Sequence, residues 1–258
     1  MIGTNDSPVQ SLDRAIQILE ELALHRDGCG VTSLANLTGL HKSTVHRLLN
    51  ALMSKGYVSK NNENDKYSLG MKILYLSSAL LDRMDIRTVA KPFLEQLCRD
   101  TDEVVHLSIL DGREAVYIDK VESPNKSIRM YSQIGKRVPL HCTGVGKILL
   151  AWLPENEVEY ILGVKGMKAY TKNTITSIAE MKKHLAEIRD KGYAFDEIEH
   201  EEEIRCVAAP IFNMNGKVVA SVSISGPVMY VTLDRMPKLT EEVLKTAKSI
   251  SYQLGYFK

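Results

Sequence analysis

The chain has 258 residues, a length that suits two domains better than one. Hydrophobic residues make up 44% and charged residues 25%, which is the composition of a globular protein and excludes a fibrous or disordered chain. The net charge is only +1, so nucleic-acid binding requires a local basic patch.

Compartment and redox state follow from what the sequence lacks. No apolar run approaches the roughly 18 residues of a membrane span, and the N-terminus MIGTNDSP does not resemble a signal peptide. We therefore expect a cytoplasmic protein without a membrane partner. The four cysteines are scattered without paired spacing, which favours reduced thiols over disulfides: they are Cys29, Cys98, Cys142 and Cys206.

The first third of the chain predicts three helices followed by a small hairpin. Apolar residues from Leu12 onward keep helical spacing, with Ser11 as the expected N-cap, and Thr32 is the expected cap of a short second helix. We expect helices from residue 12, at 32–38 and at 41–55, and strands at 57–59 and 66–69. This order is typical of a winged helix-turn-helix.

The third predicted helix has a polar face opposite an apolar stripe. The stripe consists of Val45, Leu48, Leu49, Leu52 and Met53. Residues 41–60 carry basic residues and no acidic one, and short polar side chains suit base edges while lysines suit phosphates. The candidate DNA contacts are Thr32, Lys42, Ser43, Thr44, His46, Arg47, Asn50 and Lys60.

Two other interpretations of this segment were weighed. The polar face could be the solvated side of a protein-binding domain, since winged helices also mediate protein contacts. His41 and His46 could bind a metal ion, but two histidines at this spacing are more often polar surface. We favour DNA over both.

The segment LTGLHKSTVHRLLNALMSKGYV, followed by YSLGMKIL, resembles the DNA-binding half of the IclR family of bacterial transcriptional regulators. The resemblance implies a winged helix-turn-helix in residues 1–70 that binds a double-stranded operator. It also implies a linker helix in residues 71–84 that helps the chain form a homodimer or a dimer of dimers. Reading two half-sites requires at least a dimer.

The remaining residues, 85–258, predict an α+β domain in which helices enclose strands. We expect helices at 86–100, 146–152, 155–162, 178–191 and 238–254, and strands at 104–110, 114–121, 127–131, 207–212 and 218–225. The last two strands flank Asn215-Gly216, a strong hairpin signal.

The stretch LHCTGVGKILLA contains Gly-x-Gly-Lys, which raises the question of a nucleotide phosphate loop. Such a loop needs an earlier glycine where this chain has His141, and a Ser or Thr where it has Ile148. Both requirements fail. Gly144 and Gly146 instead mark the start of a helix, whose first N–H groups suit a small anion such as a carboxylate.

Two further segments carry polar residues. In VVASVSIS, Ser221, Ser223 and Ser225 share one face of a strand, which fits a solvent-exposed face or a pocket equally well. The acidic residues between Asp196 and Glu203 predict a solvated loop, except that Asp196 follows apolar residues and is expected to point inward.

These segments, with GYAFD, RCVAAPIF and SISGP, also resemble the effector-binding domain of the IclR family, so the resemblance covers nearly the whole chain. It implies a small organic effector between the glycine-containing loop and the sheet. The implied pocket residues are Met130, Val138, Gly144, Val145, Asp196, Ile204, Cys206, Ser223 and Ser225. The family often has glycine where this chain has Glu203.

The expected function is that of a DNA-binding transcriptional regulator, a repressor of a catabolic operon controlled by a small carboxylate with hydroxyl or keto oxygens. No cofactor or metal is expected. One alternative is a thiol-dependent enzyme acting on a small organic acid, with Cys206 as nucleophile and His200 or His141 as base. Another is a metal site joining His141, Cys142, His200 and Cys206, which their spacing does not support. A third is a pure protein-interaction module.

Overall fold

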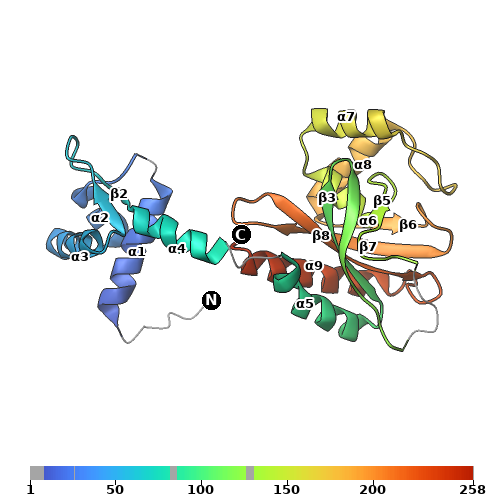
Figure 1. Ribbon diagram of the computed structural model, residues 1–258, viewed down its shortest axis with the longest axis horizontal. Helices are drawn as coiled ribbons and strands as arrows, with labels where there is room; N and C mark the ends of the chain where they lie inside the picture. Colours follow the sequence, from blue (N-terminus) through green and yellow to red (C-terminus); the bar gives the residue numbers. More distant parts are fainter. Residues whose placement is uncertain (1–8, 26, 82–85, 126–130, 258) are drawn as a thin grey trace. The chain divides into compact units, whose positions relative to one another are not determined.

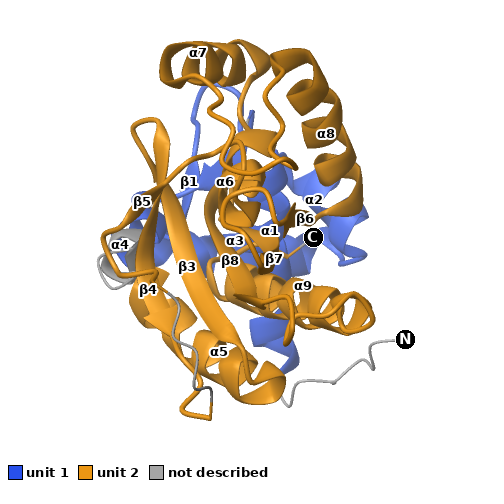
Figure 2. Cartoon of the chain, turned by 90° about the vertical axis from the view of Figure 1, so that its right-hand side faces the viewer, with its two compact units in different colours: residues 1–83 blue, residues 84–258 orange. Residues whose placement is uncertain are grey.

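The computed structural model describes residues 9–25, 27–81, 86–125 and 131–257. The chain divides into two compact units, residues 1–83 and 84–258 (Figure 2). Each unit has its own apolar core. No helix in the described ranges is long and apolar enough to cross a membrane.

The first unit contains the predicted helices and hairpin (Figure 1). Its elements are α1 (Gln10–Leu24), α2 (Val31–Thr38), α3 (Lys42–Ser54), β1 (Val58–Lys60), β2 (Tyr67–Leu69) and α4 (Met71–Leu81). Ile18, Leu34, Val45 and Leu49 are fully buried where α1, α2 and α3 meet. β1 and β2 pair antiparallel as a small wing.

The predicted helix caps in this unit are wrong. Val9 precedes α1 and Gly30 precedes α2, and the side chains of Ser11 and Thr32 cap neither helix. At α2 the cause is tertiary: Cys29 forms a β-bridge with Tyr67, so the chain turns into the helix directly after this bridge. A long-range contact thus moves the helix start by one residue.

The second unit is built on one antiparallel sheet. Its helices are α5 (Ile86–Thr101), α6 (Gly144–Ala151), α7 (Glu155–Lys165), α8 (Ile178–Lys191) and α9 (Met236–Gln253). Its strands are β3 (Val104–Asp111), β4 (Glu114–Val121), β5 (Arg137–Val138), β6 (Ala194–Glu197), β7 (Ile204–Phe212) and β8 (Val218–Pro227). Within the described residues the strands lie in the order β5-β4-β3-β8-β7-β6.

The two faces of this sheet differ in chemistry. Helices α5 and α9 cover one face, where Val105, Val222 and Ile224 enter the apolar core (Figure 1). The alternate residues, including His106 and Ser223, point to the face covered by α6. Because strand side chains alternate between faces, the same strands supply a dry core on one side and polar groups on the other.

The predicted and observed strands of this unit differ at three places. Most of the strand expected at 127–131 lies outside the described residues, and Tyr131 is not in a strand. β5 was not predicted, and β6 occupies part of the expected acidic loop. The remaining predicted elements of this unit are found with ends shifted by at most three residues, including the β7–β8 hairpin at Asn215-Gly216.

Candidate functional site

The polar face of α3 is presented to solvent as predicted. Lys42, Ser43, His46, Arg47 and Asn50 are exposed, whereas Thr44 is half-buried. The opposite stripe holds the helix against the core of the unit through Val45 and Leu49. The helix therefore offers a row of donors and acceptors with no acidic residue in its sequence. Thr32 is exposed near the start of α2.

Two pairings organise the polar groups near α3. The Asn50 amide nitrogen lies 3.2 Å from Nδ1 of His46, and when the amide donates to Nδ1 a neutral imidazole carries its proton on Nε2. On the wing, the Lys60 ammonium lies 2.5 Å from the Asp65 carboxylate, which raises the pKa of Lys60. The charge of Lys60 is therefore already partly balanced.

A small cavity lies between α6 and the polar face of the sheet. The structure brings together eight of the predicted pocket residues around it: Val138, Gly144, Val145, Asp196, Ile204, Cys206, Ser223 and Ser225. Met130 lies outside the described residues. Residues that the sequence interpretation missed also line it: His106, Tyr117, Ser132, Lys136, Thr143, His200 and Glu201.

The cavity is nearly closed. Its volume is about 30 Å³, space for one or two water molecules, so a bound effector must enlarge it. Lys136 and Glu201, both on its lining, lie 4.0 Å apart and are partly exposed. A long lysine and a long glutamate in a weak exposed ion pair can move aside at little cost.

The N-terminus of α6 forms one wall of this cavity. The Thr143 hydroxyl accepts the N–H of Gly146 at 3.1 Å and donates to the carbonyl of Pro139 at 2.7 Å. The N–H groups of Gly144 and Val145, in the first turn, have no intrahelical acceptor. Together with the helix dipole they favour an anion at this end of the cavity.

The glycines of this motif allow close packing within the protein. A Cβ on Gly146 would lie 2.5 Å from the Cα of Leu140, which no real structure permits. A Cβ on Gly144 would lie 3.0 Å from Sγ of Cys206 on β7. Gly144 thus seats α6 directly on the sheet, and Lys147 is not a phosphate ligand but is fully buried against Glu199.

The acidic segment is anchored rather than fully solvated, which corrects the sequence prediction. Lys147 forms an ion pair with Glu199 and lies 3.4 Å from Nε2 of His184. Burial, with Lys147 nearby, lowers the pKa of His184 to about 4, so this histidine is neutral. The Glu199 N–H donates to Asp196 at 2.7 Å, which ties the segment to the cavity.

Asp196 points inward as expected and is 5% exposed. Burial raises its pKa to about 7, although the N–H of Glu199 and the charge of Lys147 act in the opposite direction. At neutral pH the carboxyl is therefore divided between its charged and protonated forms. A protonated Asp196 donates a hydrogen bond, whereas an ionised one only accepts.

Glu203 adopts the left-handed conformation with a φ of +61°. This conformation strains any residue with a Cβ and suits glycine, which explains physically why glycine fits this position. The carbonyl of Glu203 accepts the N–H of Val228 at 2.8 Å, so the loop conformation is held from outside. Glutamate in this place therefore does not disrupt the start of β7.

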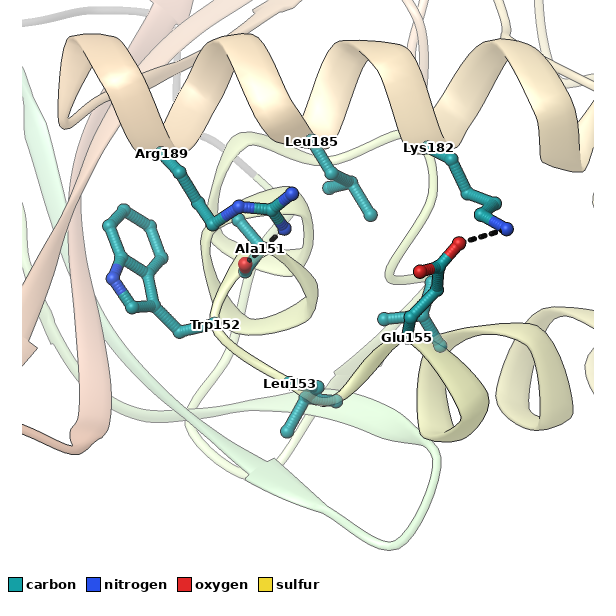
Figure 3. A pocket seen from close by; sticks show the side chains of 8 residues that line it. Ala151, Trp152, Leu153, Glu155, Lys182, Leu185 and Arg189 are labelled. Carbon is teal, nitrogen blue, oxygen red and sulfur yellow. Dashed lines mark hydrogen bonds and ion pairs between the residues drawn. The ribbon is translucent and has the colours of Figure 1, made fainter.

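A larger hollow lies elsewhere in the second unit, between α6, α7 and α8 (Figure 3). Its volume is about 370 Å³. Its polar groups are already paired: Lys182 with Glu155, and Arg189 with the carbonyl of Ala151 at 2.8 Å. This hollow is larger than the cavity under α6, but the smaller cavity contains buried polar atoms that have no hydrogen-bond partner among the described residues, which is what a ligand requires.

The geometry does not support the thiol-dependent enzyme or the metal site that the sequence analysis considered as alternatives. Burial raises the pKa of the Cys206 thiol to about 12, so it remains protonated and is a poor nucleophile. His141 bonds to the carbonyl of Lys168 at 2.9 Å. Among the described residues no group of three or more His, Cys, Asp or Glu is placed to hold a metal ion.

A winged helix-turn-helix combined with a domain that encloses a buried polar cavity defines a ligand-responsive transcriptional regulator. Two domain families of IclR regulators match the chain, "IclR helix-turn-helix domain" over residues 11–62 and "Bacterial transcriptional regulator IclR C-terminal" over residues 78–252. The chain therefore belongs to the IclR family of bacterial transcriptional regulators.

Individual relatives agree along nearly the full length. The HTH-type transcriptional regulator XynR of Escherichia coli is 39% identical, over 96% of this chain and 98% of that protein. The transcriptional repressor IclR of the same species is 36% identical, over 96% and 90%. The crystal structure of the Thermotoga maritima IclR is 36% identical with a TM-score of 0.64, covering 95% of this chain and 99% of that one.

This family assignment makes the chain a DNA-binding transcriptional regulator and not an enzyme. It confirms the predicted fold class of a winged helix-turn-helix with a larger α+β domain. The thiol-dependent enzyme is left without support.

Proposed function

We propose that this chain is a cytoplasmic repressor of a catabolic operon, released from its operator by a small hydroxylated monocarboxylate. The observation that carries the effector is the cavity under α6, which combines free helix N–H groups with buried polar side chains. Two relatives support the regulatory role, since one is named a transcriptional repressor and the other a transcriptional regulator.

The carboxylate is assigned to the N–H groups of Gly144 and Val145. These groups need an acceptor, and the helix dipole favours a negative charge there. Ser223 and Ser225 are buried on the opposite wall and can donate to further oxygens. Among the described residues that line the cavity none is an arginine, which favours one carboxylate over a phosphate or a diacid.

The operator is assigned to the polar face of α3 and to the wing. Arg47 is exposed and its guanidinium can donate two parallel hydrogen bonds, which suits a guanine edge, and the exposed Lys42 suits a phosphate. The chain is proposed to act as a homodimer or a dimer of dimers, because operators of helix-turn-helix proteins consist of paired half-sites.

The proposed effector site is tested with Gly144→Pro and Gly144→Ala in the full-length protein. Both add a Cβ against Cys206, but only proline removes the N–H. Proline is tolerated at the first position of a helix, and Thr143 has the extended backbone that a residue before proline needs.

The measurement is a thermal-shift screen of hydroxylated C3–C6 acids, because a ligand that binds only the folded state raises its melting temperature. We expect the parent and Gly144→Ala to be stabilised by the same acids and Gly144→Pro by none. The stabilising acids should likewise release the parent and Gly144→Ala from the operator, but not Gly144→Pro. Equal stabilisation of the proline variant would move the carboxylate away from α6.

A further inference from the structure

His106 and Ser223 are neighbours on the cavity side of the sheet. They are paired positions of the antiparallel strands β3 and β8, and each is only 1% exposed. Nδ1 of His106 and Oγ of Ser223 have no hydrogen-bond partner of good geometry among the described residues. Leaving two such groups buried and unpaired is costly, and native proteins rarely do so without a reason.

The His106 ring is held in place from two sides. Its Nε2 lies 2.7 Å from Oγ of Ser132, and its ring centroid lies 4.5 Å from that of Tyr117. Both neighbours also line the cavity. The unpaired nitrogen is therefore presented in a fixed direction rather than left on a mobile side chain.

The imidazole is also neutral. Burial, together with the charges of Lys120 and Lys136, lowers the pKa of His106 to about 3. A neutral histidine cannot serve as the counter-ion of a carboxylate, but its Nδ1 can donate a hydrogen bond to an uncharged oxygen or accept one from it. Among the described residues the nearby Ser223 hydroxyl has the thiol of Cys206 as a weak neighbour and no hydrogen-bond partner of good geometry, so it is available for the same oxygen.

The two ends of the cavity are separated by a definite distance. Gly144 lies over Ala208 of β7, which pairs with Ser223 of β8, and Ser223 pairs in turn with His106 of β3. Ser223 is therefore one strand spacing from the Gly144 end, about 5 Å, and His106 is two, about 10 Å. A hydroxyl held between these two side chains is about 5–10 Å from the carboxylate end, a distance that an extended acid of roughly four to six carbons spans.

Building on the function proposed above, we propose that His106 and Ser223 bind one hydroxyl group of the effector, carried near the end of the chain opposite its carboxylate. A hydroxyl fits because it both donates and accepts, so it pairs with His106 in either tautomer and with Ser223 at the same time. His106 is then a specificity-determining residue that selects ω-hydroxylated monocarboxylates over plain fatty acids and diacids.

The test is calorimetric titration of the full-length protein with 5-hydroxypentanoate and 6-hydroxyhexanoate, each compared with the alkanoate of equal length. In the parent we expect the hydroxyl to raise the affinity about tenfold or more at one chain length. This gain should disappear in His106→Phe and in Ser223→Ala, while the affinity for the plain alkanoate is retained. Ser223→Ala removes one oxygen only and remains informative should the phenylalanine variant fold poorly.

Ser221→Ala is the matched control. Ser221 lies on the same face of β8 and is fully buried, but its hydroxyl already donates to the carbonyl of Ala209 at 3.3 Å and does not line the cavity. It should keep the full hydroxyl gain. A gain that survives in both His106→Phe and Ser223→Ala, or a parent that binds alkanoates and hydroxyalkanoates equally, overturns the role of His106 and leaves the proposed function standing. A parent that binds none of the four acids overturns the carboxylate site itself, and this inference with it.

Discussion

Asp196 combines burial in the cavity with a pKa raised to about 7. Its charge is therefore only partly present at neutral pH. Below pH 7 the protonated group donates to a ligand oxygen, and above pH 7 the carboxylate repels an anion. The charges facing it are Lys147 and Glu199, which are paired with each other.

We predict that the affinity of the parent for a carboxylate falls as the pH rises from 6 to 8, and that Asp196→Asn shows a flatter profile in calorimetric titration.

The raised pKa of Asp196 also affects stability, because the folded protein retains a proton that the unfolded chain releases near the ordinary Asp pKa of about 4. The contribution of Asp196 to the free energy of unfolding is thus lost as the pH rises from about 4 to about 7. Urea unfolding at several pH values checks this, because the free energy of unfolding of Asp196→Asn relative to that of the parent should increase as the pH rises from about 4 to about 7. A constant difference between the two would contradict the raised pKa.

Glu203 provides a prediction about backbone strain. Its left-handed φ costs about 1–2 kcal/mol for a residue with a Cβ, and glycine avoids this cost. Glycine also loses more conformational entropy on folding, which offsets about 0.5–1 kcal/mol of that gain. Because the Glu203 side chain is exposed, Glu203→Gly should raise the free energy of unfolding by about 0.5–1 kcal/mol in urea. Glu202→Gly, at an exposed neighbour without positive φ, should lower it instead. A destabilised Glu203→Gly variant would show that the side chain stabilises the loop.

Some residues of the cavity were accessible to sequence interpretation and others were not. The alternation of Ser221, Ser223 and Ser225 placed them on one face, and the structure shows that face buried. His106 alternates with Val105 and Leu107 in the same way, so its pattern was present but was not used. Lys147 and Glu199 are 52 positions apart in the sequence, and no local sequence pattern predicts that they form an ion pair.

At the scale of elements, α3 and the wing lead to different predictions for two basic residues. Arg47→Ala should leave folding intact and cost about 1–3 kcal/mol of operator binding, with reduced discrimination between bases at one position. Lys60 is paired with Asp65, and an exposed pair is worth about 0–1 kcal/mol, so Lys60→Ala should weaken binding to all sequences slightly and alike.

Fluorescence anisotropy with the operator and with single-base variants at several salt concentrations separates the two effects. Asp65→Ala is the control, since it frees the ammonium of Lys60 and should strengthen non-specific binding. Operator affinity unchanged in both Arg47→Ala and Lys60→Ala would remove this face of the first unit from DNA recognition.

Helix α4 exposes more apolar surface than an isolated helix keeps in water. Met71, Leu74 and Tyr75 are 75%, 58% and 65% exposed, and the side chains beyond Leu76 in this helix lie outside the described residues. We predict that this surface packs across a dimer, so that Leu74→Glu shifts the protein toward monomer in analytical ultracentrifugation and weakens operator binding. Met214→Glu, which charges an equally exposed apolar residue of the β7–β8 turn, should remain dimeric. A fully dimeric Leu74→Glu variant would require another interface.

Elements were easier to predict than their ends. Regular apolar spacing defined α3, α8 and α9, and the Asn-Gly turn defined the β7–β8 hairpin. β5 and β6 are short strands whose pairing partners, β4 and β7, determine them. A two-residue strand at Arg137–Val138 has no periodicity to detect. Such edge strands exist because the neighbouring strand offers hydrogen bonds, which is a tertiary effect.

At the scale of the whole molecule, the DNA-binding face and the cavity belong to different compact units with separate cores. A ligand in one unit can act on the operator only if it prefers one of two states of the whole protein. The cavity of about 30 Å³ must enlarge to admit an acid, so ligand binding changes the second unit physically. The free energy available for regulation is then the difference between the affinities of the acid for the two states.

The last prediction follows from this coupling. If an acid lowers the operator affinity by a given factor, the operator must lower the affinity for that acid by the same factor, and such factors are commonly about 5–150. Calorimetry with and without saturating operator, together with anisotropy with and without the acid, measures both sides for one preparation. In Gly144→Pro we expect the operator affinity without ligand to equal that of the parent, and the effect of the acid on it to vanish. Operator affinity that stays constant in the parent while the acid binds would mean that the cavity holds a ligand without regulating the DNA-binding unit.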